Sequence, residues 1–318
     1  MGFLRKGDNH AGKTFEVRSL LRSVEMKGKV RKITAISLCL LFSAAMLLVL
    51  GCGAQNEHLA KGKELLKSNK RRKEERAVAE FKLAIKEEPD NAEAHYLIGY
   101  YDENATIQQR GEHLYLAYKN DRRKYLDVLI YETLRVNDRD LIQATLYALR
   151  KAYKTGGQKE VLKKLLEAIK SKDSRDRYDA GVALAYIGDK KEGDPDRVVP
   201  ELIKLLDHKR MGTRLNAVLA LGEIGDERAV DPIYQRIILI TEEKSEESPE
   251  VRRLAVEAIG KIGTKSAISK LIEIIQDKGS SLRVDAIEVL AKIAGQDVVP
   301  ILTHILGEKG AREVKVKI

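Results

Sequence analysis

Apolar residues recur at the same spacing in four segments of the C-terminal part of the chain. Each segment opens with an arginine, followed by alanine at offset 3, an aliphatic residue at offset 7 and isoleucine at offset 10. These offsets lie on one face of a helix, so the pattern predicts four amphipathic helices. Glycine at offset 11 predicts where the first three of them end. The helices are expected at 177–188, 214–225, 252–263 and 283–294.

A second apolar stretch follows each segment and predicts a partner helix. These stretches are 199–206, 230–237, 268–275 and 299–306. Polar inserts at 190–195 and 241–250 lengthen two of the periods. The second insert ends in Ser248-Pro249-Glu250, which predicts a helix start, because serine caps, proline suits the first position and glutamate favours the helix dipole.

This arrangement resembles HEAT-like repeats of the short type that also occurs in phycobilin lyases, over residues 173–307. The resemblance implies an all-α fold, an alpha-alpha superhelix in which stacked helix pairs bury Ala, Leu and Ile between units. Residues 121–172 are linking helices or a degenerate repeat, with the degenerate unit placed at 138–170. The anchor arginines are expected to bond carbonyls or acids of a neighbouring unit. The polar, basic tail 308–318 is expected to be flexible.

An earlier helical segment, 53–120, precedes this stack. Ala77, Phe81, Ala84 and Pro89 are spaced as in the second helix of a tetratricopeptide repeat, and 91–100 is similar to the opening of the next unit. The resemblance implies closely packed helix pairs over about one and a half units. His95 takes the place of an aromatic residue in that pattern, so we expect it to be packed rather than to bind a ligand.

In solenoids the binding surface is usually the concave one, which we expect the second helices to line. Polar side chains stand between the apolar ridges of these helices and form a mixed ladder that suits a protein or peptide partner. For any single position, an ordinary solvated helix face is the alternative. The candidate binding residues are Glu201, Lys204, Tyr234, Gln235, Lys270, Glu273, Thr303 and His304.

The N-terminal region carries a different pattern. Residues 33–50 contain no charge, and the six residues before them hold four Lys/Arg. A basic stretch followed by an apolar one is typical of a secretory signal. The signal has ordinary length if translation starts at Met26, so we expect residues 1–25 to result from a misplaced start. The signal region is placed at 1–52.

Val49-Leu50-Gly51-Cys52, at the end of this run, resembles the lipobox of bacterial lipoproteins. The resemblance implies cleavage before Cys52 and acylation there, with palmitate-type chains that anchor the protein stably. An uncleaved signal anchor is the alternative, because eighteen apolar residues can barely span a bilayer. Gly53 follows the cysteine instead of the aspartate that marks inner-membrane retention. The expected location is therefore the cell envelope, on the periplasmic side of the outer membrane if the cell has two membranes.

The chain has a net charge of +10, which could suggest a nucleic-acid partner, but most of this charge lies in the signal region. Residues 1–52 hold nine Lys/Arg and three Asp/Glu, so the rest of the chain carries 49 and 45 and is nearly balanced. A phosphate-binding surface needs clustered positive charge, so no nucleic acid is expected. The only other cysteine, Cys39, lies in the signal, which leaves the mature chain without a thiol.

No sequence motif for catalysis stands in the chain. It lacks G-x-x-x-x-G-K-[ST], G-x-S-x-G and H-E-x-x-H, and its six histidines lack metal spacing. We therefore expect no enzyme activity, no cofactor and no metal site. The leading hypothesis is a lipid-anchored scaffold that binds another envelope protein. An accessory or lyase-like module acting on a bound partner is the alternative, and a purely structural assembly subunit is a third.

Overall fold

The computed structural model describes residues 56–68, 71–239 and 248–294, together with 300, 303–304 and 307. Contacts divide the chain into two units, 1–57 and 58–318. Nearly all described residues belong to the second unit, and those described contain helices and no strand. Within these ranges no helix has both the length and the apolar character needed to cross a membrane. The expected signal with Cys52, the tail 308–318 and most of 299–306 lie outside the described residues.

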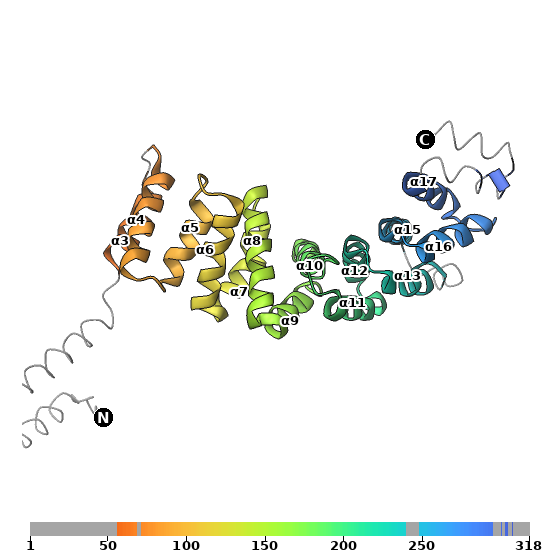
Figure 1. The fold of residues 1–318 in the computed structure, drawn as a ribbon, viewed down its shortest axis with the longest axis horizontal. Coiled ribbons are helices and arrows are strands. Elements are labelled where there is room, and N and C mark those ends of the chain that lie inside the picture. The colour runs from red at the N-terminus through yellow and green to blue at the C-terminus, as the bar shows by residue number, and fades with distance from the viewer. Residues whose placement is uncertain are drawn as a thin grey trace, which may run out of the picture. The chain divides into compact units, whose positions relative to one another are not determined.

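The described helices follow one another in antiparallel pairs (Figure 1). The earlier ones are α3 (Glu57–Lys67), α4 (Lys73–Glu87), α5 (Ala92–Tyr101), α6 (Ile107–Asn120), α7 (Arg122–Tyr131), α8 (Arg139–Ala152) and α9 (Gln158–Ala168). The later ones are α10 (Ser174–Ile187), α11 (Pro195–Lys204), α12 (Met211–Ile224), α13 (Val230–Ile233), α15 (Pro249–Ile262), α16 (Lys265–Gln276) and α17 (Arg283–Ala294).

Two rows of helices make up the later part of the second unit. We call α8, α10, α12, α15 and α17 the first row, and each of these helices contacts the next along the chain. The second row consists of α9, α11, α13 and α16, which pack beside the first row. The four helices predicted from the arginine register are thus α10, α12, α15 and α17. The degenerate unit is the pair α8 and α9.

Capping residues set several helix ends where the sequence predicts them. Ser248 accepts a hydrogen bond from the Glu250 backbone N–H at 3.2 Å and starts α15 at Pro249. Gly225 and Gly263 end α12 and α15 in the left-handed conformation, with φ of 72° and 65°. Gly188 also ends its helix, α10, but with φ of −89°, outside the left-handed region.

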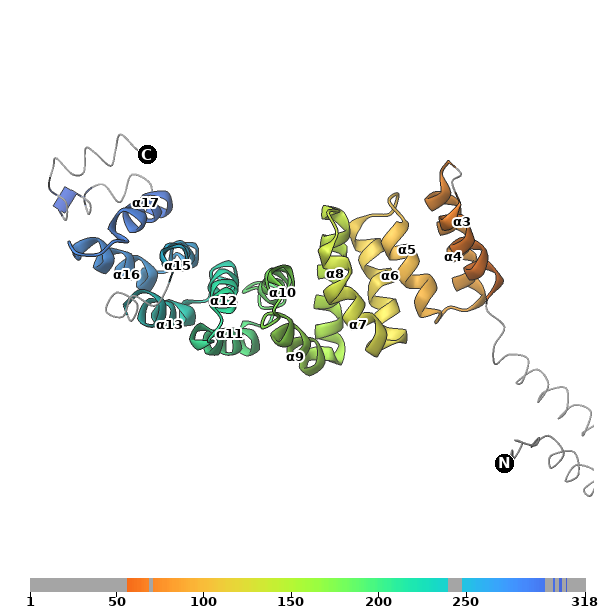
Figure 2. The same cartoon turned by 180° about the vertical axis from the view of Figure 1, so that it is seen from behind.

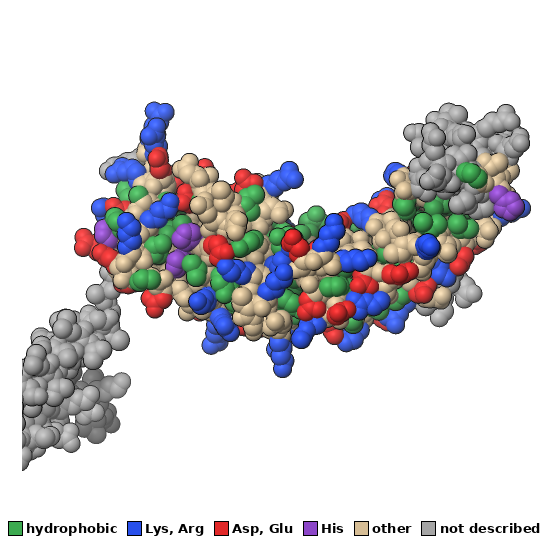
Figure 3. Space-filling view, viewed as in Figure 1, with side chains coloured by type: hydrophobic (Ala, Val, Ile, Leu, Met, Phe, Trp, Pro, Cys, Tyr) green, Lys and Arg blue, Asp and Glu red, His purple; other side chains and the backbone are tan. Residues whose placement is uncertain are grey.

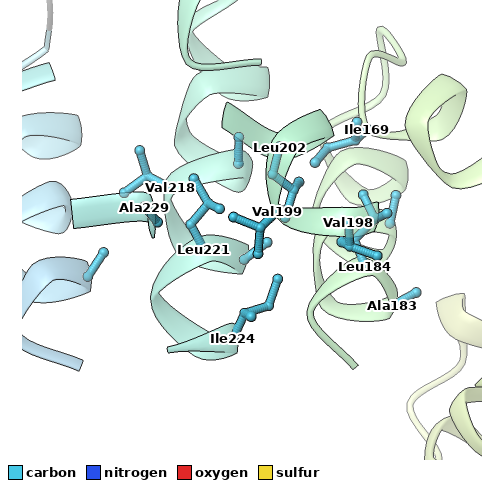
Figure 4. Close-up of a cluster of buried hydrophobic side chains, with 14 of the residues drawn as sticks. Ile169, Ala183, Leu184, Val198, Val199, Leu202, Val218, Leu221, Ile224 and Ala229 are labelled. Carbon is cyan, nitrogen blue, oxygen red and sulfur yellow. The ribbon is translucent and has the colours of Figure 1, made fainter. Parts of the chain in front are cut away.

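One continuous core extends through the paired helices. It begins at Leu114 in α6 and runs to Ala291 in α17, and most of its members are Ala, Val, Leu and Ile. Figure 4 shows the part where α10, α11 and α12 meet, with Leu184, Val199 and Leu221 among its buried side chains. Burying such a side chain contributes about 1.5–3 kcal/mol. Because α6 already shares this core, no break separates it from the helices that follow.

A smaller core holds the first helices of the unit together. It includes the predicted residues Ala77, Phe81 and Ala84, all fully buried. Gly62 of α3 lies against the Phe81 ring, so that a Cβ at position 62 would come within 2.3 Å of it. His95 is buried, as predicted, and its Nδ1 and Nε2 lie 2.9 Å from His113 Nδ1 and 3.0 Å from the Pro89 carbonyl oxygen.

Small residues at offset 8 from the anchor arginines let neighbouring first-row helices approach closely. These residues are Ala185, Gly222, Gly260 and Ala291. A Cβ added to Gly222 would come within 2.8 Å of the Ala258 Cβ and 2.9 Å of its Cα. At Gly181 the added Cβ would lie 3.4 Å from Asn216, which is ordinary contact.

We therefore expect Gly222→Ala to destabilise the protein by about 1 kcal/mol, because overpacking against a backbone outweighs the gain in helix propensity. Gly181→Ala is the matched control and should be neutral or stabilising. Urea unfolding followed by circular dichroism measures both. A Gly222→Ala protein as stable as Gly181→Ala would show that α12 and α15 do not pack this closely.

Candidate functional site

The predicted ladder lies on the second row. Glu201 and Lys204 stand on α11, Lys270 and Glu273 on α16, and Tyr234 and Gln235 follow directly after α13. Thr303 and His304 belong to a short described piece near the C-terminal end, where Thr303 is half-buried and His304 is exposed.

Most of the ladder's charges are neutralised by neighbours on the same helix. Lys204 Nζ lies 2.6 Å from Glu201 Oε1, and Lys270 Nζ lies 3.0 Å from Glu273 Oε1. Lys270 also covers the Tyr234 ring, with its Nζ 4.8 Å from the ring centroid. Tyr234 is only 6% exposed, so its side chain offers little surface to a partner.

The ladder does not line the concave side of the stack. Figures 1 and 2 place α9, α11, α13 and α16 on the outer side of the bend and the first row on its inner side. The expectation that second helices line the concave surface is therefore wrong for this unit. The direction of the bend depends on how closely each row packs, and the small residues that shorten the spacing stand in the first row.

The inner side carries an apolar patch that the sequence analysis missed. Five side chains of α10 and α12 lie opposite the buried faces of these helices, which pack on the second row. Tyr178 and Met211 are 57% and 47% exposed, and the other three are half-buried. The space-filling view shows the hollowed upper side on which the first row lies (Figure 3). The inner patch consists of Tyr178, Val182, Met211, Leu215 and Leu219.

On α15 charged residues take the place of the patch. The α15 residues equivalent to Leu215 and Leu219 are Arg253 and Glu257, which form an ion pair. The signal that could have found the patch is therefore a difference between repeats at offsets 1 and 5. A consensus across repeats hides such a difference, because it keeps only what the units share.

Three anchor arginines tie their first-row helices, α10, α12 and α17, to the part of the chain just before them. Arg177 Nη1 donates to the carbonyl oxygens of Ser171 and Lys172, both at 2.9 Å. Arg214 Nη1 donates to the His208 carbonyl at 2.7 Å. Arg283 Nε donates to the Ile275 carbonyl, within α16, at 2.8 Å. For these three arginines the predicted bond to carbonyls of a neighbouring unit is confirmed.

Asp179 is a buried carboxylate beside the inner patch. It is 9% exposed, and its Oδ2 accepts no hydrogen bond from the described residues. The nearby Arg135 is already paired with Asp173 and Asp176, each at 2.7 Å. Burial raises the pKa of Asp179 to about 6, despite the opposing charges of Arg175 and Arg135. An ionised Asp179 therefore destabilises the fold at neutral pH.

In the part of the chain that the structure describes, no three His, Cys, Asp or Glu side chains are grouped so that they could hold a metal ion. His95 and the half-buried His113 form a close pair of imidazole rings, with no third such group beside them among the described residues. Burial, together with the charge of His95, lowers the pKa of His113 to about 4. His113 is therefore neutral at physiological pH, and the two rings belong to the packing between α5 and α6.

A known repeat family matches the part of the chain that forms the two rows of helices. HEAT repeats match residues 162–238 and 237–316. This part of the chain carries HEAT repeats. The predicted fold class, an all-α solenoid of HEAT-like repeats, is confirmed. The matched region begins inside α9 and so includes half of the degenerate pair.

Other comparisons add little. Crystal structures of three engineered proteins from the Northeast Structural Genomics Consortium are similar at 20%, 18% and 19% identity, each with a TM-score of 0.34. They cover 75%, 82% and 79% of this chain and 99%, 98% and 75% of their own. Likeness at this level supports no argument about function. No curated protein matches the chain.

Because the pKa of Asp179 is raised, the unfolded chain loses this proton at lower pH than the folded one. Stability from this group is complete below the ordinary value of 3.8 and is lost as the pH rises through about 6. We expect Asp179→Asn to raise the melting temperature at pH 7.5 by about 2–4 °C, or about 1 kcal/mol, and to have no effect near pH 4.

Asp176→Asn is the control for this substitution, since it removes an ion pair with Arg135 and should lower the melting temperature. Differential scanning calorimetry across pH 4–8 measures both variants. A gain for Asp179→Asn that persists at pH 4 would contradict the account.

Proposed function

We propose that the protein is a membrane-anchored scaffold that binds another protein of the cell envelope on the inner side of its HEAT repeats. The observation that carries this proposal is the inner patch. Exposed Tyr and Met side chains next to half-buried Val and Leu are typical of a protein-binding surface, because folded proteins usually cover contiguous apolar surface.

The geometry of the inner patch suits a helical segment of the partner protein. Val182 and Tyr178 are four residues apart on α10, and Leu215 and Leu219 are four apart on α12, so two apolar ridges run along adjacent helices. An amphipathic helix can lay its apolar face between such ridges. The tetratricopeptide-like pairs α3–α6 would extend the scaffold toward its N-terminal tether.

Substitutions in the inner patch test the proposed binding of a partner protein. We expect Tyr178→Asp combined with Met211→Asp to reduce capture of the partner from envelope membranes of the source cells at least tenfold, because both charges would have to be desolvated in the complex. Both side chains are well exposed, so helix content should not change.

Leu83→Asp on α4, another exposed apolar position, is the matched control and should capture as the wild type does. Affinity capture followed by mass spectrometry measures all three proteins. Undiminished capture by the double variant would place the binding surface elsewhere, and capture of no protein by the wild type would favour a purely structural role.

The membrane anchor rests on the sequence pattern that ends at Cys52. Several acyl chains on one residue hold a protein on a membrane stably, where one chain alone is marginal. We expect Cys52→Ser to move the protein from the membrane fraction to the soluble fraction when it is expressed in bacteria, or to leave it as an unprocessed precursor.

Cys39→Ser is the control, since position 39 lies in the segment expected to be removed, and that variant should be processed normally. Fractionation with mass spectrometry of the N-terminal peptide measures the result. An unmodified cysteine in a processed wild-type protein would overturn the lipid anchor.

A further inference from the structure

A groove runs between α9 and α11 on the outer side of the stack, away from the inner patch. It has a volume of about 670 Å³ and is lined on the α9 side by residues such as Lys159, Leu162 and Leu166, and on the α11 side by Pro200 and Glu201. It continues into a second hollow of about 520 Å³ beside η3 (Leu205–Asp207). The two hollows share Leu166, Lys170 and Glu201, so they form one outer groove.

The floor of the outer groove is apolar. Leu162 and Leu166 stand four residues apart on α9 and are half-buried, and Pro200 is exposed on the facing helix. A ligand lying there would therefore cover apolar surface, which favours a peptide with apolar side chains over a simple ion.

The acidic residues of the groove are already neutralised. Glu201 pairs with Lys204 at 2.6 Å, and Asp196 pairs with Arg228 at 2.9 Å. Glu167 lies 3.9 Å from Lys163, and Asp207 pairs with Arg236. Each negative charge thus has a cation beside it, and none opposes an incoming carboxylate on its own.

Three lysines of the groove have no such partner. Lys159, Lys170 and Lys209 form no ion pair with any described residue, and they stand at the start, the middle and the far end of the groove. Two of them, Lys170 and Lys209, act on His208, which lines the same groove. Burial lowers the pKa of His208, and the charges of Lys170 and Lys209 lower it further.

We propose that the outer groove binds an acidic peptide segment of a partner protein, with carboxylates on Lys159, Lys170 and Lys209 and apolar side chains on Leu162 and Leu166. The α9 helix of 11 residues is about 16 Å long, which an extended peptide covers with about five residues. The groove and the inner patch lie on opposite rows, so the scaffold would hold two segments at once.

The test uses a fluorescein-labelled ten-residue peptide of glutamates and two leucines, titrated with the protein and followed by anisotropy. We expect binding that weakens severalfold between 50 and 300 mM salt, because exposed charges are screened. The triple variant Lys159→Glu, Lys170→Glu, Lys209→Glu should bind at least tenfold more weakly. The same peptide with glutamine in place of glutamate should not bind.

The control reverses three exposed lysines outside the groove, Lys86, Lys119 and Lys278, and so has the same net charge as the test variant. It should bind the acidic peptide as the wild type does. Equal loss in both variants, or equal binding of the glutamine peptide, would overturn the proposal. So would binding to phosphatidylglycerol vesicles that depends on the three groove lysines while the peptide does not bind, which would make the surface a lipid contact.

Discussion

Every other feature of this protein depends on one constraint, that a helix pair can bury its apolar face only against the pairs beside it. Leu184, Ile187 and Leu221 are buried because α10, α11 and α12 meet, and none of these helices could cover them alone. The small residues of the first row keep neighbouring helices close enough for this. Arg177 and Arg214 bind carbonyls of the segments before their helices, and Arg283 binds a carbonyl of α16. Stability in such a stack is close to a sum of unit and interface terms.

The same constraint leaves the inner and outer sides of the stack exposed to solvent. Packing occupies the sides of each first-row helix that face its neighbours and the second row, so what remains on the inner side can vary between units. In α10 and α12 it is apolar, and in α15 it is an internal ion pair. On the outer side, Lys170 follows α9 and Lys209 follows η3, and neither forms an ion pair with a described residue. Both proposed binding surfaces thus lie on positions that the repeat does not need for packing.

Much of the helical framework could be predicted from the sequence because it recurs. The arginine register places α10, α12, α15 and α17, and Ser248 and Gly225 mark helix ends by known local chemistry. The candidate surface could not be placed in this way. Which row faces the inside of the bend depends on packing distances that accumulate over many interfaces, and Tyr234 is buried because Lys270 and its neighbours cover it. Tyr178 and Met211 escaped notice because they differ from their equivalents in other units.

The central claim is that the inner side of the HEAT stack contacts a partner protein. Site-specific photocrosslinking in cells tests it most directly, with a benzophenone amino acid placed at position 182 on the inner patch or at position 273 on the outer row. We predict a discrete crosslinked product of higher mass from position 182 that is absent from position 273. A product from position 273 with none from position 182 would contradict it.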